Sequence, residues 1–430
     1  MSRSLVRRLA GSEFSPLTGA WLSVLAAAAL SLVGIYAIDV GSADEPERGF
    51  VTMSGVVLRQ MIFLGIGIAC AMVVAVPHFR LVRLAAWPLM AVVLALLVFL
   101  LLPFVPASIV TPRNGARAWI NFGPVDFQPA ELAKIAYVLV MADYLRLREN
   151  HRTALGLIAP AAISFIPVAL IMLQPDLGTA LLFAPVAFAM LIAAGAKLKH
   201  LSIVVLVAAL AAPAAFPLLK PHQKARIVGL IQMVQDPLAG ADAINYQAWT
   251  AQRLAGAGGV WGLSGGKSRA LVRYNKLPER HNDMIFAVVM NRFGLVGGAV
   301  VLGLYVLWFA GAYLTAALCR DAFGRLIVIG FAGFILAQTL VNVGMTIGML
   351  PIIGITLPFL SYGGSSMLTV WVMTGAVLGV GLRQSKRFAR PSFEFGEQPY
   401  DPAQITTAHR AATAGGHNSG RTGGRGGLLG

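Results

Sequence analysis

Apolar runs close to twenty residues long recur along this 430-residue chain, from Ala20 to Val380. About 20 apolar residues in a helix cross the ~30 Å hydrocarbon core of a bilayer, and a helix satisfies its own backbone hydrogen bonds there. Because 57% of the residues are hydrophobic and only 12% are charged, the chain has more apolar surface than a water-soluble core buries. We therefore expect an all-α polytopic membrane protein.

Hydropathy and helix breakers predict about ten transmembrane helices, with a large extracytoplasmic loop between spans 7 and 8. The basic N-terminus resembles a signal peptide, but the first apolar run is long for one, so we expect a retained first span. Residues 1–17 are expected to be a cytoplasmic segment, 18–385 the membrane domain, and 386–430 a basic, then Gly-rich, disordered cytoplasmic tail. The expected spans lie near residues 18–38, 56–76, 82–103, 129–145, 154–173, 178–195, 200–219, 283–316, 326–348 and 364–382.

The formal net charge of +16 raises the possibility of nucleic-acid binding. However, the Lys and Arg residues form short clusters between the apolar runs rather than one basic face, so we expect no nucleic-acid partner. With a cytoplasmic N-terminus, every short inside loop is basic, as the positive-inside rule requires. Both termini are then cytoplasmic, and the long segments near 105–128 and 220–282 are external. The inside clusters are Arg80 and Arg83; Arg146, Arg148 and Arg152; Lys197 and Lys199; and Arg320 and Arg325.

Several common kinds of site lack support in the sequence. Cys70 and Cys319 suggest no disulfide, and the seven His residues show no zinc-ligand spacing. The stretch GGVWGLSGGKS, 258–268, has Trp261 where a phosphate-binding loop needs Gly. We expect this stretch to be a flexible external loop.

Charged residues stand at the outer ends of several predicted spans. Gln128-Pro129 and Gln174-Pro175 each precede an acidic residue and an apolar run, and proline suits the first helical position. Glu131 and Lys134 are three residues apart, which places them on one helix face. They form either a pair that neutralises itself or an ionic element that lines a polar cavity.

Other charged residues also allow two interpretations. Asp176, in QPDLGT, either favours a helix N-terminus or holds the shape of the outer cavity. Arg113 and Arg117, near Trp119, suit an interfacial anchor or simple snorkelling. Asp283 stands where the charged segment 276–282 enters an apolar run, so it is either a helix cap or a functional carboxylate.

Taken together and in order, five segments resemble the RodA/FtsW family of peptidoglycan polymerases, the SEDS proteins. The resemblance covers most of residues 15–385. The segments are NGARAWINFG with QPAELAK (114–134), QPDLGT (174–179), YQAWTAQRLAGAGGVWGLSGG (246–266), LPERHNDMIFAVV (277–289) and NVGMTIGMLPIIGITLPFLSYGGSS (342–366).

The resemblance implies a glycosyltransferase that polymerises lipid II at the outer face of the cytoplasmic membrane, beside a class B penicillin-binding protein. The aspartate that this family uses for catalysis corresponds to Asp283, and the family's acidic and basic cavity residues correspond to Glu131, Lys134 and Asp176. The first span ends LVGIYAIDVG, which favours the RodA-like elongation branch over the FtsW-like division branch.

The chain also departs from the family pattern. Ala130 replaces a usual Ser, and Asn282-Asp283-Met284 stands for Thr-Asp-Phe. Asn291-Arg292 occupies the place of an acidic pair, which puts a metal site built on those carboxylates in doubt.

Joining lipid II to the hydroxyl of another unit needs a general base and charge stabilisation of the leaving pyrophosphate. We assign Asp283 as the base, with Glu279 as the alternative, and Arg113, Arg117 and Arg226 as pyrophosphate-binding candidates. No cofactor is certain; a divalent cation, Mg²⁺ or Mn²⁺, is an alternative. Membrane lipids surround the spans. Rival hypotheses are a lipid II flippase or transporter and a catalytically silent scaffold for the transpeptidase.

Overall fold

The computed structural model describes residues 18–42, 54–106, 108–110, 112, 116–123, 125–147, 153, 155–218, 221–235, 245–275 and 277–383. They belong to one compact unit, Met1–Gln384. The predicted N-terminal segment 1–17 and tail 386–430 lie outside the described residues.

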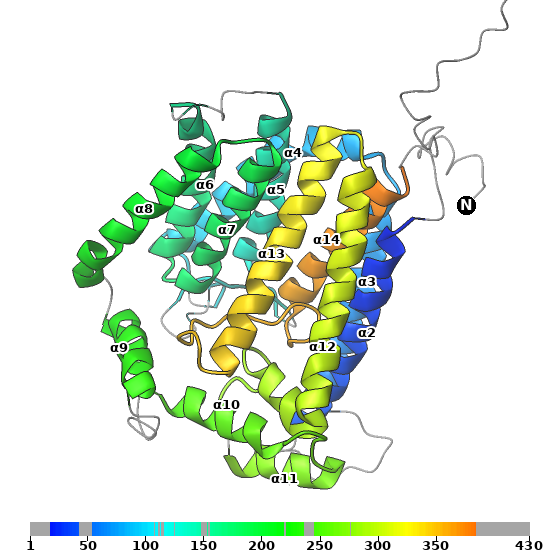
Figure 1. The fold of residues 1–430 in the computed structure, drawn as a ribbon, viewed down its shortest axis with the longest axis vertical. Coiled ribbons are helices and arrows are strands. Elements are labelled where there is room, and N and C mark those ends of the chain that lie inside the picture. The colour runs from blue at the N-terminus through cyan, green and yellow to red at the C-terminus, as the bar shows by residue number, and fades with distance from the viewer. Residues whose placement is uncertain are drawn as a thin grey trace, which may run out of the picture. The chain divides into compact units, whose positions relative to one another are not determined.

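A helix lies at each of the ten ranges predicted to cross the membrane (Figure 1). Among the described residues, seven helical stretches are long and apolar enough to do so, which confirms an all-α polytopic fold; the count of ten stays a prediction. The ten helices are α2 (Ala20–Gly41), α3 (Gly55–Ala75), α4 (Phe79–Leu101), α5 (Pro129–Leu147), α6 (Ile158–Leu173), α7 (Leu177–Ala193), α8 (Leu198–Ala215), α12 (Ile285–Leu318), α13 (Ala322–Thr346) and α14 (Gly364–Gly381).

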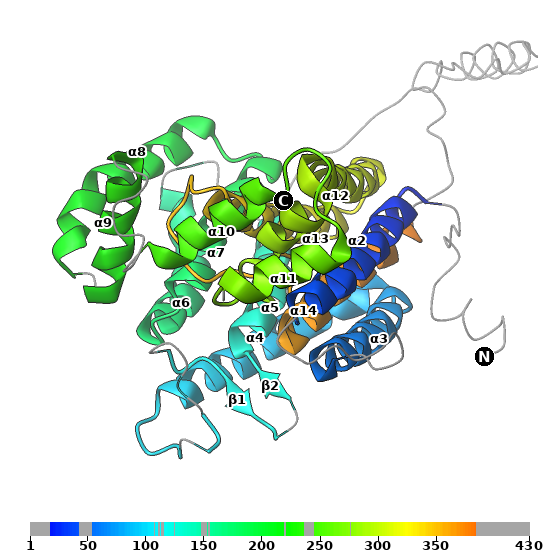
Figure 2. The same cartoon turned by 90° about the horizontal axis from the view of Figure 1, so that it is seen from below.

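The connection between α8 and α12 is largely helical. It holds η3 (Phe216–Leu218), α9 (Pro221–Gln235), α10 (Tyr246–Ala257) and α11 (Gly265–Asn275), and a further short helix, η2 (Leu155–Leu157), precedes α6. Residues 258–264 of the stretch predicted to be a Gly-rich loop are non-helical, but its last four residues, 265–268, belong to α11, so the prediction was wrong for that part. Helices α9, α10 and α11 lie at the same end of the bundle as the antiparallel strands β1 (Ile120–Asn121) and β2 (Asp126–Phe127) (Figure 2).

Helix α5 lies in the core of the bundle, and nearly all of its residues from 129 to 142 are buried. Its Tyr137 ring meets Phe183 of α7 and Phe334 of α13 edge-on, with ring centroids 5.1 Å and 6.2 Å away. By contrast, large apolar side chains are exposed along α8, from Ile203 to Leu210, as expected for helices whose solvent is lipid. The core therefore fixes α5, α7 and α13, which carry several of the polar residues described below.

The starts of the helices test the predictions from proline and aspartate. Helix α5 begins at Pro129, as predicted, but α7 begins at Leu177, after Pro175, with Asp176 as its N-cap. Helix α12 begins at Ile285, and its N-cap is Met284, which has no side-chain capping bond. The interpretation of Asp283 as the N-cap of this helix was therefore wrong.

Candidate active site

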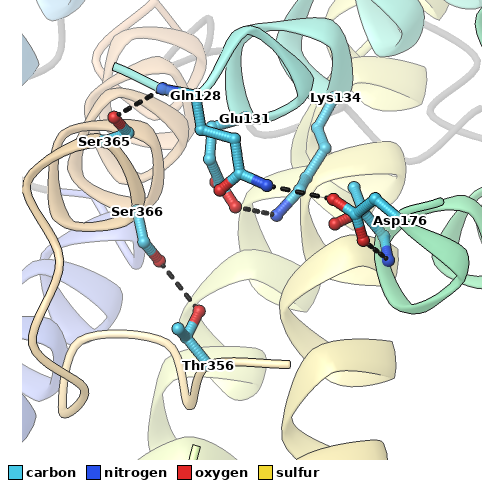
Figure 3. A network of polar contacts seen from close by, with 8 residues as sticks. Gln128, Glu131, Lys134, Asp176, Thr356, Ser365 and Ser366 are labelled. Atoms are coloured by element: carbon cyan, nitrogen blue, oxygen red, sulfur yellow. Dashed lines mark hydrogen bonds and ion pairs between the residues drawn. The ribbon is translucent and has the colours of Figure 1, made fainter. Parts of the chain in front are cut away.

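A buried ion pair lies in the first two turns of α5. Lys134 Nζ is 2.7 Å from Glu131 Oε1, and the two residues are only 1% and 5% exposed (Figure 3). The predicted i,i+3 pair is therefore present. The second oxygen of Glu131, Oε2, is buried and lacks a hydrogen-bond partner among the described residues. The charges of Glu131 and Lys134 thus neutralise each other, while Oε2 of Glu131 can still accept a hydrogen bond.

Asp176 connects this pair to the start of α7. One oxygen, Oδ1, accepts from the Thr179 main-chain N–H at 3.0 Å, which is an N-cap bond. The other, Oδ2, accepts from Gln128 Nε2 at 3.0 Å. Burial raises the pKa of the Asp176 carboxyl, and the Thr179 hydrogen bond and the Lys134 charge partly offset this rise. The predicted role of Asp176 at a helix start is confirmed, and its role in an outer cavity stays a prediction.

Hydroxyl groups at the start of α14 continue the network (Figure 3). Ser365 Oγ accepts from the Gln128 main-chain N–H at 3.0 Å and lies 3.1 Å from the main-chain oxygen of Asp126, to which it donates. The neighbouring Ser366 Oγ lies 3.2 Å from Thr356 Oγ1. The first turn of α14 is thereby held against the start of α5.

Residues 351–357 form an extended segment that crosses this network. A Cβ added at Gly178 would lie 2.6 Å from the main-chain oxygen of Ile353, so the segment packs directly on the first turn of α7. Gly354 has a φ of 77°, a left-handed conformation that suits glycine. The extended segment therefore packs on the start of α7 and, through Thr356, contacts Ser366 of α14.

The turn that carries Asp283 is bonded to the far side of the same segment. Asn342 Nδ2 of α13 donates to the main-chain oxygens of Asp283 and Ile355, each at 2.7 Å. Ser361 Oγ donates to the Asn282 oxygen at 2.6 Å. The Asp283 carboxylate lies over Gly354, with Oδ2 3.5 Å from the position of an added Cβ. Asp283 and the ion-pair network thus lie on one continuous hydrogen-bonded framework.

The other predicted site residues are less closely connected. Glu279 is exposed and accepts from Asn282 Nδ2 at 2.6 Å, within the turn of Asp283. Arg117 is half-buried and donates from Nη2 to the Val105 oxygen at 3.2 Å. Arg113 and the side chain of Arg226 lie outside what the structure describes. The structure therefore brings Glu131, Lys134 and Asp176 together, links the Asp283 turn to them indirectly through residues 351–357 and α14, and leaves the pyrophosphate-binding candidates as predictions.

The donor set does not fit a divalent ion held by the protein alone. Over the described part of the chain, no three His, Cys, Asp or Glu side chains converge. Asn291, which stands in place of a family acid, uses both amide atoms in hydrogen bonds to Ser268 and Leu254.

Sequence reasoning assigned no role to five residues that hold the site together: Gln128, Asn342, Thr356, Ser365 and Ser366. The sequence gives the clearest signal for Asn342, because this residue interrupts an apolar run. In the structure it is fully buried. A buried amide needs partners, but its partners are 59 and 13 residues away. Chemically, the site offers two half-buried carboxylates, Asp176 and Asp283, a neutral ion pair and several hydroxyls, which suits proton removal from a polar, hydroxyl-bearing substrate.

Comparisons with known proteins agree with this geometry. Residues 18–386 match the model of the FtsW/RodA/SpoVE cell cycle proteins. The chain is 31% identical to stage V sporulation protein E of Bacillus subtilis (84% of this chain, 96% of the relative). It is 34% identical to the probable peptidoglycan glycosyltransferase FtsW of Shewanella sediminis (82% and 83%).

Solved structures give the same result. A chain from a study of polymerization and crosslinking by a peptidoglycan synthase complex aligns with a TM-score of 0.70 and 31% identity, covering 87% of this chain and all of that one. An aspartate-to-alanine mutant of Thermus thermophilus RodA aligns with a TM-score of 0.60 and 28% identity, covering 87% and 99%. This multi-pass membrane protein therefore belongs to the FtsW/RodA/SpoVE family.

Proposed function

We propose that this protein is a peptidoglycan glycosyltransferase that polymerises lipid II into glycan strands at the outer face of the cytoplasmic membrane, with Asp283 as the general base. Relatives named as probable peptidoglycan glycosyltransferases support the activity. The observation that carries the proposal is the set of hydrogen bonds that fixes the turn of the half-buried Asp283, with its carboxylate over Gly354.

In the proposed reaction, the sugar hydroxyl of one unit attacks the anomeric carbon of another. The Asp283 carboxylate takes the hydroxyl proton as the new C–O bond forms. The bond from the anomeric carbon to the polyprenyl pyrophosphate breaks, and the pyrophosphate leaves with the electron pair. Because this displacement is direct, the anomeric centre is inverted, and one carboxylate suffices.

The leaving pyrophosphate needs cations rather than a proton, since it is a weak base. Lys134 is committed to Glu131 at 2.7 Å, so external arginines are better candidates. We propose Arg113, Arg117 and Arg226 for this role, with a divalent ion accompanying the substrate as the alternative. The polyprenyl chain would lie against apolar spans, which need no directional contacts.

The protein's partner, its orientation in the membrane and its role in elongation or division are part of the same proposal. The peptidoglycan synthase complex among the structural neighbours supports a class B penicillin-binding protein as partner. The basic ends of the helices opposite α9–α11 support an orientation with both termini in the cytoplasm. The relatives named FtsW and the solved structures of RodA represent the division branch and the elongation branch of the family. We propose the RodA-like elongation role because the first span ends with the sequence LVGIYAIDVG.

Purified protein incubated with lipid II tests the activity directly. We expect glycan chains whose formation depends on Asp283. A liposome assay for lipid II translocation, run in parallel, tests the rival transporter. Translocation without polymerisation would favour the transporter, and neither activity would favour a scaffold.

A further inference from the structure

A break divides α12 into two parts, and the outer part follows Asp283 directly. At Gly294 the backbone has φ 69° and ψ −165°, a conformation available essentially only to glycine. Residues 285–293 thus form a short half-helix. The long inner part of α12, residues 295–318, does not fix the direction in which this half-helix points. Other contacts must set that direction, and with it the orientation of the Asp283 turn.

The segment 258–263, which joins α10 to α11, bonds to α12 on both sides of the break. The main-chain N–H of Leu263 donates to the Asn291 oxygen at 3.1 Å, on the outer side. The main-chain N–H of Val296 donates to the Val260 oxygen at 3.1 Å, on the inner side. The segment therefore bridges the break with main-chain hydrogen bonds.

Glycines allow the two backbones to come this close. A Cβ at Gly258 would lie 2.0 Å from the Met290 oxygen, and one at Gly294 would lie 2.3 Å from the Val260 oxygen. Neither distance is possible for a real side chain, and each obstacle is main chain rather than a flexible side chain. The bridge thus depends on direct backbone contact.

Asn291 adds a side-chain connection from the half-helix to both outer helices. It is fully buried. Its Nδ2 donates to the main-chain oxygen of Leu254 in α10 at 2.8 Å, and its Oδ1 accepts from Ser268 Oγ of α11 at 2.7 Å. The amide supplies one donor and one acceptor at once, which an ionised carboxylate at this position could not do.

Arg292 connects the same half-helix in another direction. Its Nε donates to the Tyr36 hydroxyl of α2 at 3.0 Å, and its Nη1 donates to the Leu263 oxygen at 2.8 Å. The guanidinium also lies 5.1 Å from the ring centroid of Phe293. The two residues that replace an acidic pair therefore both serve to fix the half-helix.

We propose that Asn291 is a positioning residue for Asp283: by bonding α10 and α11 to the outer half of broken helix α12, it sets the orientation of the catalytic turn. This rests on the proposed function, because Asp283 must act in the reaction for its orientation to matter. Asn291 itself touches no reacting atom. Its effect passes through residues 285–293.

The experiment compares Asn291→Leu and Ser268→Ala with the matched control Asn275→Ala. Asn275 lies on α11, and among the described residues its Nδ2 donates within that helix, to the Leu271 oxygen at 2.8 Å. We measure kcat and KM for lipid II polymerisation, and amide hydrogen exchange over residues 281–293 in the full-length protein. Ser268→Ala removes one hydrogen bond and serves as the test if Asn291→Leu does not fold.

For Asn291→Leu we expect kcat to fall about 10- to 100-fold, as for a slightly misplaced catalytic group, with KM within about twofold. Exchange over 281–293 should become faster. Ser268→Ala should lower kcat about fivefold, the value of one ordinary hydrogen bond. Asn275→Ala should change neither measurement.

Two outcomes would overturn the proposal alone while the wild type polymerises lipid II. One is a normal kcat in a folded Asn291→Leu or, if that variant does not fold, in Ser268→Ala. The other is a lower kcat with unchanged exchange over 281–293, which would mean that Asn291 acts by another route. A wild type that makes no glycan would overturn the proposed function and this proposal together.

Discussion

The side-chain amide of Asn342 donates to the main-chain oxygen of Asp283 at 2.7 Å. The same nitrogen donates to Ile355 in the extended segment, also at 2.7 Å. A single amide on α13 therefore holds the turn of the proposed base at a set distance from the segment that crosses the ion-pair network.

Asn342→Ala should impair both folding and activity. The lost amide leaves two carbonyl oxygens without this donor, at a cost of about 1–3 kcal/mol in unfolding free energy. We expect kcat to fall about 10- to 100-fold because Asp283 is less well oriented. Thermal unfolding in detergent and polymerisation of lipid II measure the two effects.

Thr339→Val provides the control for this prediction. Thr339 is buried in the same helix, and its hydroxyl bonds to the Ile335 oxygen, one turn earlier, at 2.7 Å and to the Tyr305 side chain, rather than to the Asp283 turn. Its replacement should leave kcat near the wild-type value. Equal losses in both variants would show that α13 is merely sensitive to polar deletions.

Glu131 and Lys134 should behave as a coupled pair. Glu131→Gln or Lys134→Met leaves the other charge buried without its partner, which costs about 3–5 kcal/mol. Removing both charges together should cost less than the sum of the single changes. A double-mutant cycle of unfolding free energies measures the coupling, and strictly additive losses would contradict it.

Asp176 predicts a dependence of stability on pH. Because burial raises the pKa of its carboxyl in the folded protein above the usual value near 4, the folded state keeps the proton over a pH range where the unfolded state has lost it. The contribution of Asp176 to stability therefore falls as the pH rises from about 4 through the folded pKa, and it is greatest below that window.

The variant Asp176→Asn should remove this dependence. Asparagine still accepts from the Thr179 N–H as an N-cap, and its amide can pair with that of Gln128. The difference in melting temperature between wild type and variant, followed from pH 4 upwards, isolates the contribution of this one group. A difference that does not change with pH would contradict the raised pKa.

The proposed topology places α11 outside and the α12–α13 turn inside. Tyr274 of α11 is 84% exposed, and Arg320 in the turn is exposed too. In a chain without Cys70 and Cys319, Tyr274→Cys should react with a membrane-impermeant maleimide in intact cells, and Arg320→Cys only after permeabilisation. The reverse pattern would invert the orientation.

The sequence was sufficient for features that depend on local composition. Apolar runs located ten helices, and the spacing of Glu131 and Lys134 predicted their contact, because both signals lie within a few residues. The helices of the 220–282 connection were missed, since α11 carries exposed Lys267, Arg269 and Arg273 and lacks an apolar run.

Long-range contacts explain the rest of what was missed. The break in α12 depends on Gly294 meeting Val260, and a glycine in an apolar run does not reveal whether another backbone will approach it. Similarly, Asn342 bonds to Asp283 across 59 residues, and nothing in the sequence indicates that pairing. From the sequence, Asn291-Arg292 shows only the loss of an acidic pair. The hydrogen bonds by which these two residues hold the half-helix 285–293 are visible only in the fold.

The proposed base gives the most direct test, because asparagine can replace aspartate as a helix cap but not as a base. The N-cap of α12 is Met284 without a side-chain bond, so Asp283→Asn removes no N-cap at that position. Asparagine keeps the main-chain oxygen that Asn342 binds and nearly the same shape, but it cannot take a proton from a hydroxyl. We expect normal insertion and a melting temperature close to that of the wild type.

Polymerisation should then fall by about 10²–10⁴-fold, the usual contribution of a general base. Glu279→Gln is the matched control, because Glu279 is an exposed carboxylate in the same turn and is hydrogen-bonded to Asn282. Its loss should leave most of the activity. If Asp283→Asn polymerises lipid II at a near-normal rate while Glu279→Gln does not, the base is Glu279, and the turn must close over the site during the reaction. If both variants are active, proton removal does not depend on either carboxylate, and the mechanism proposed for this site is wrong.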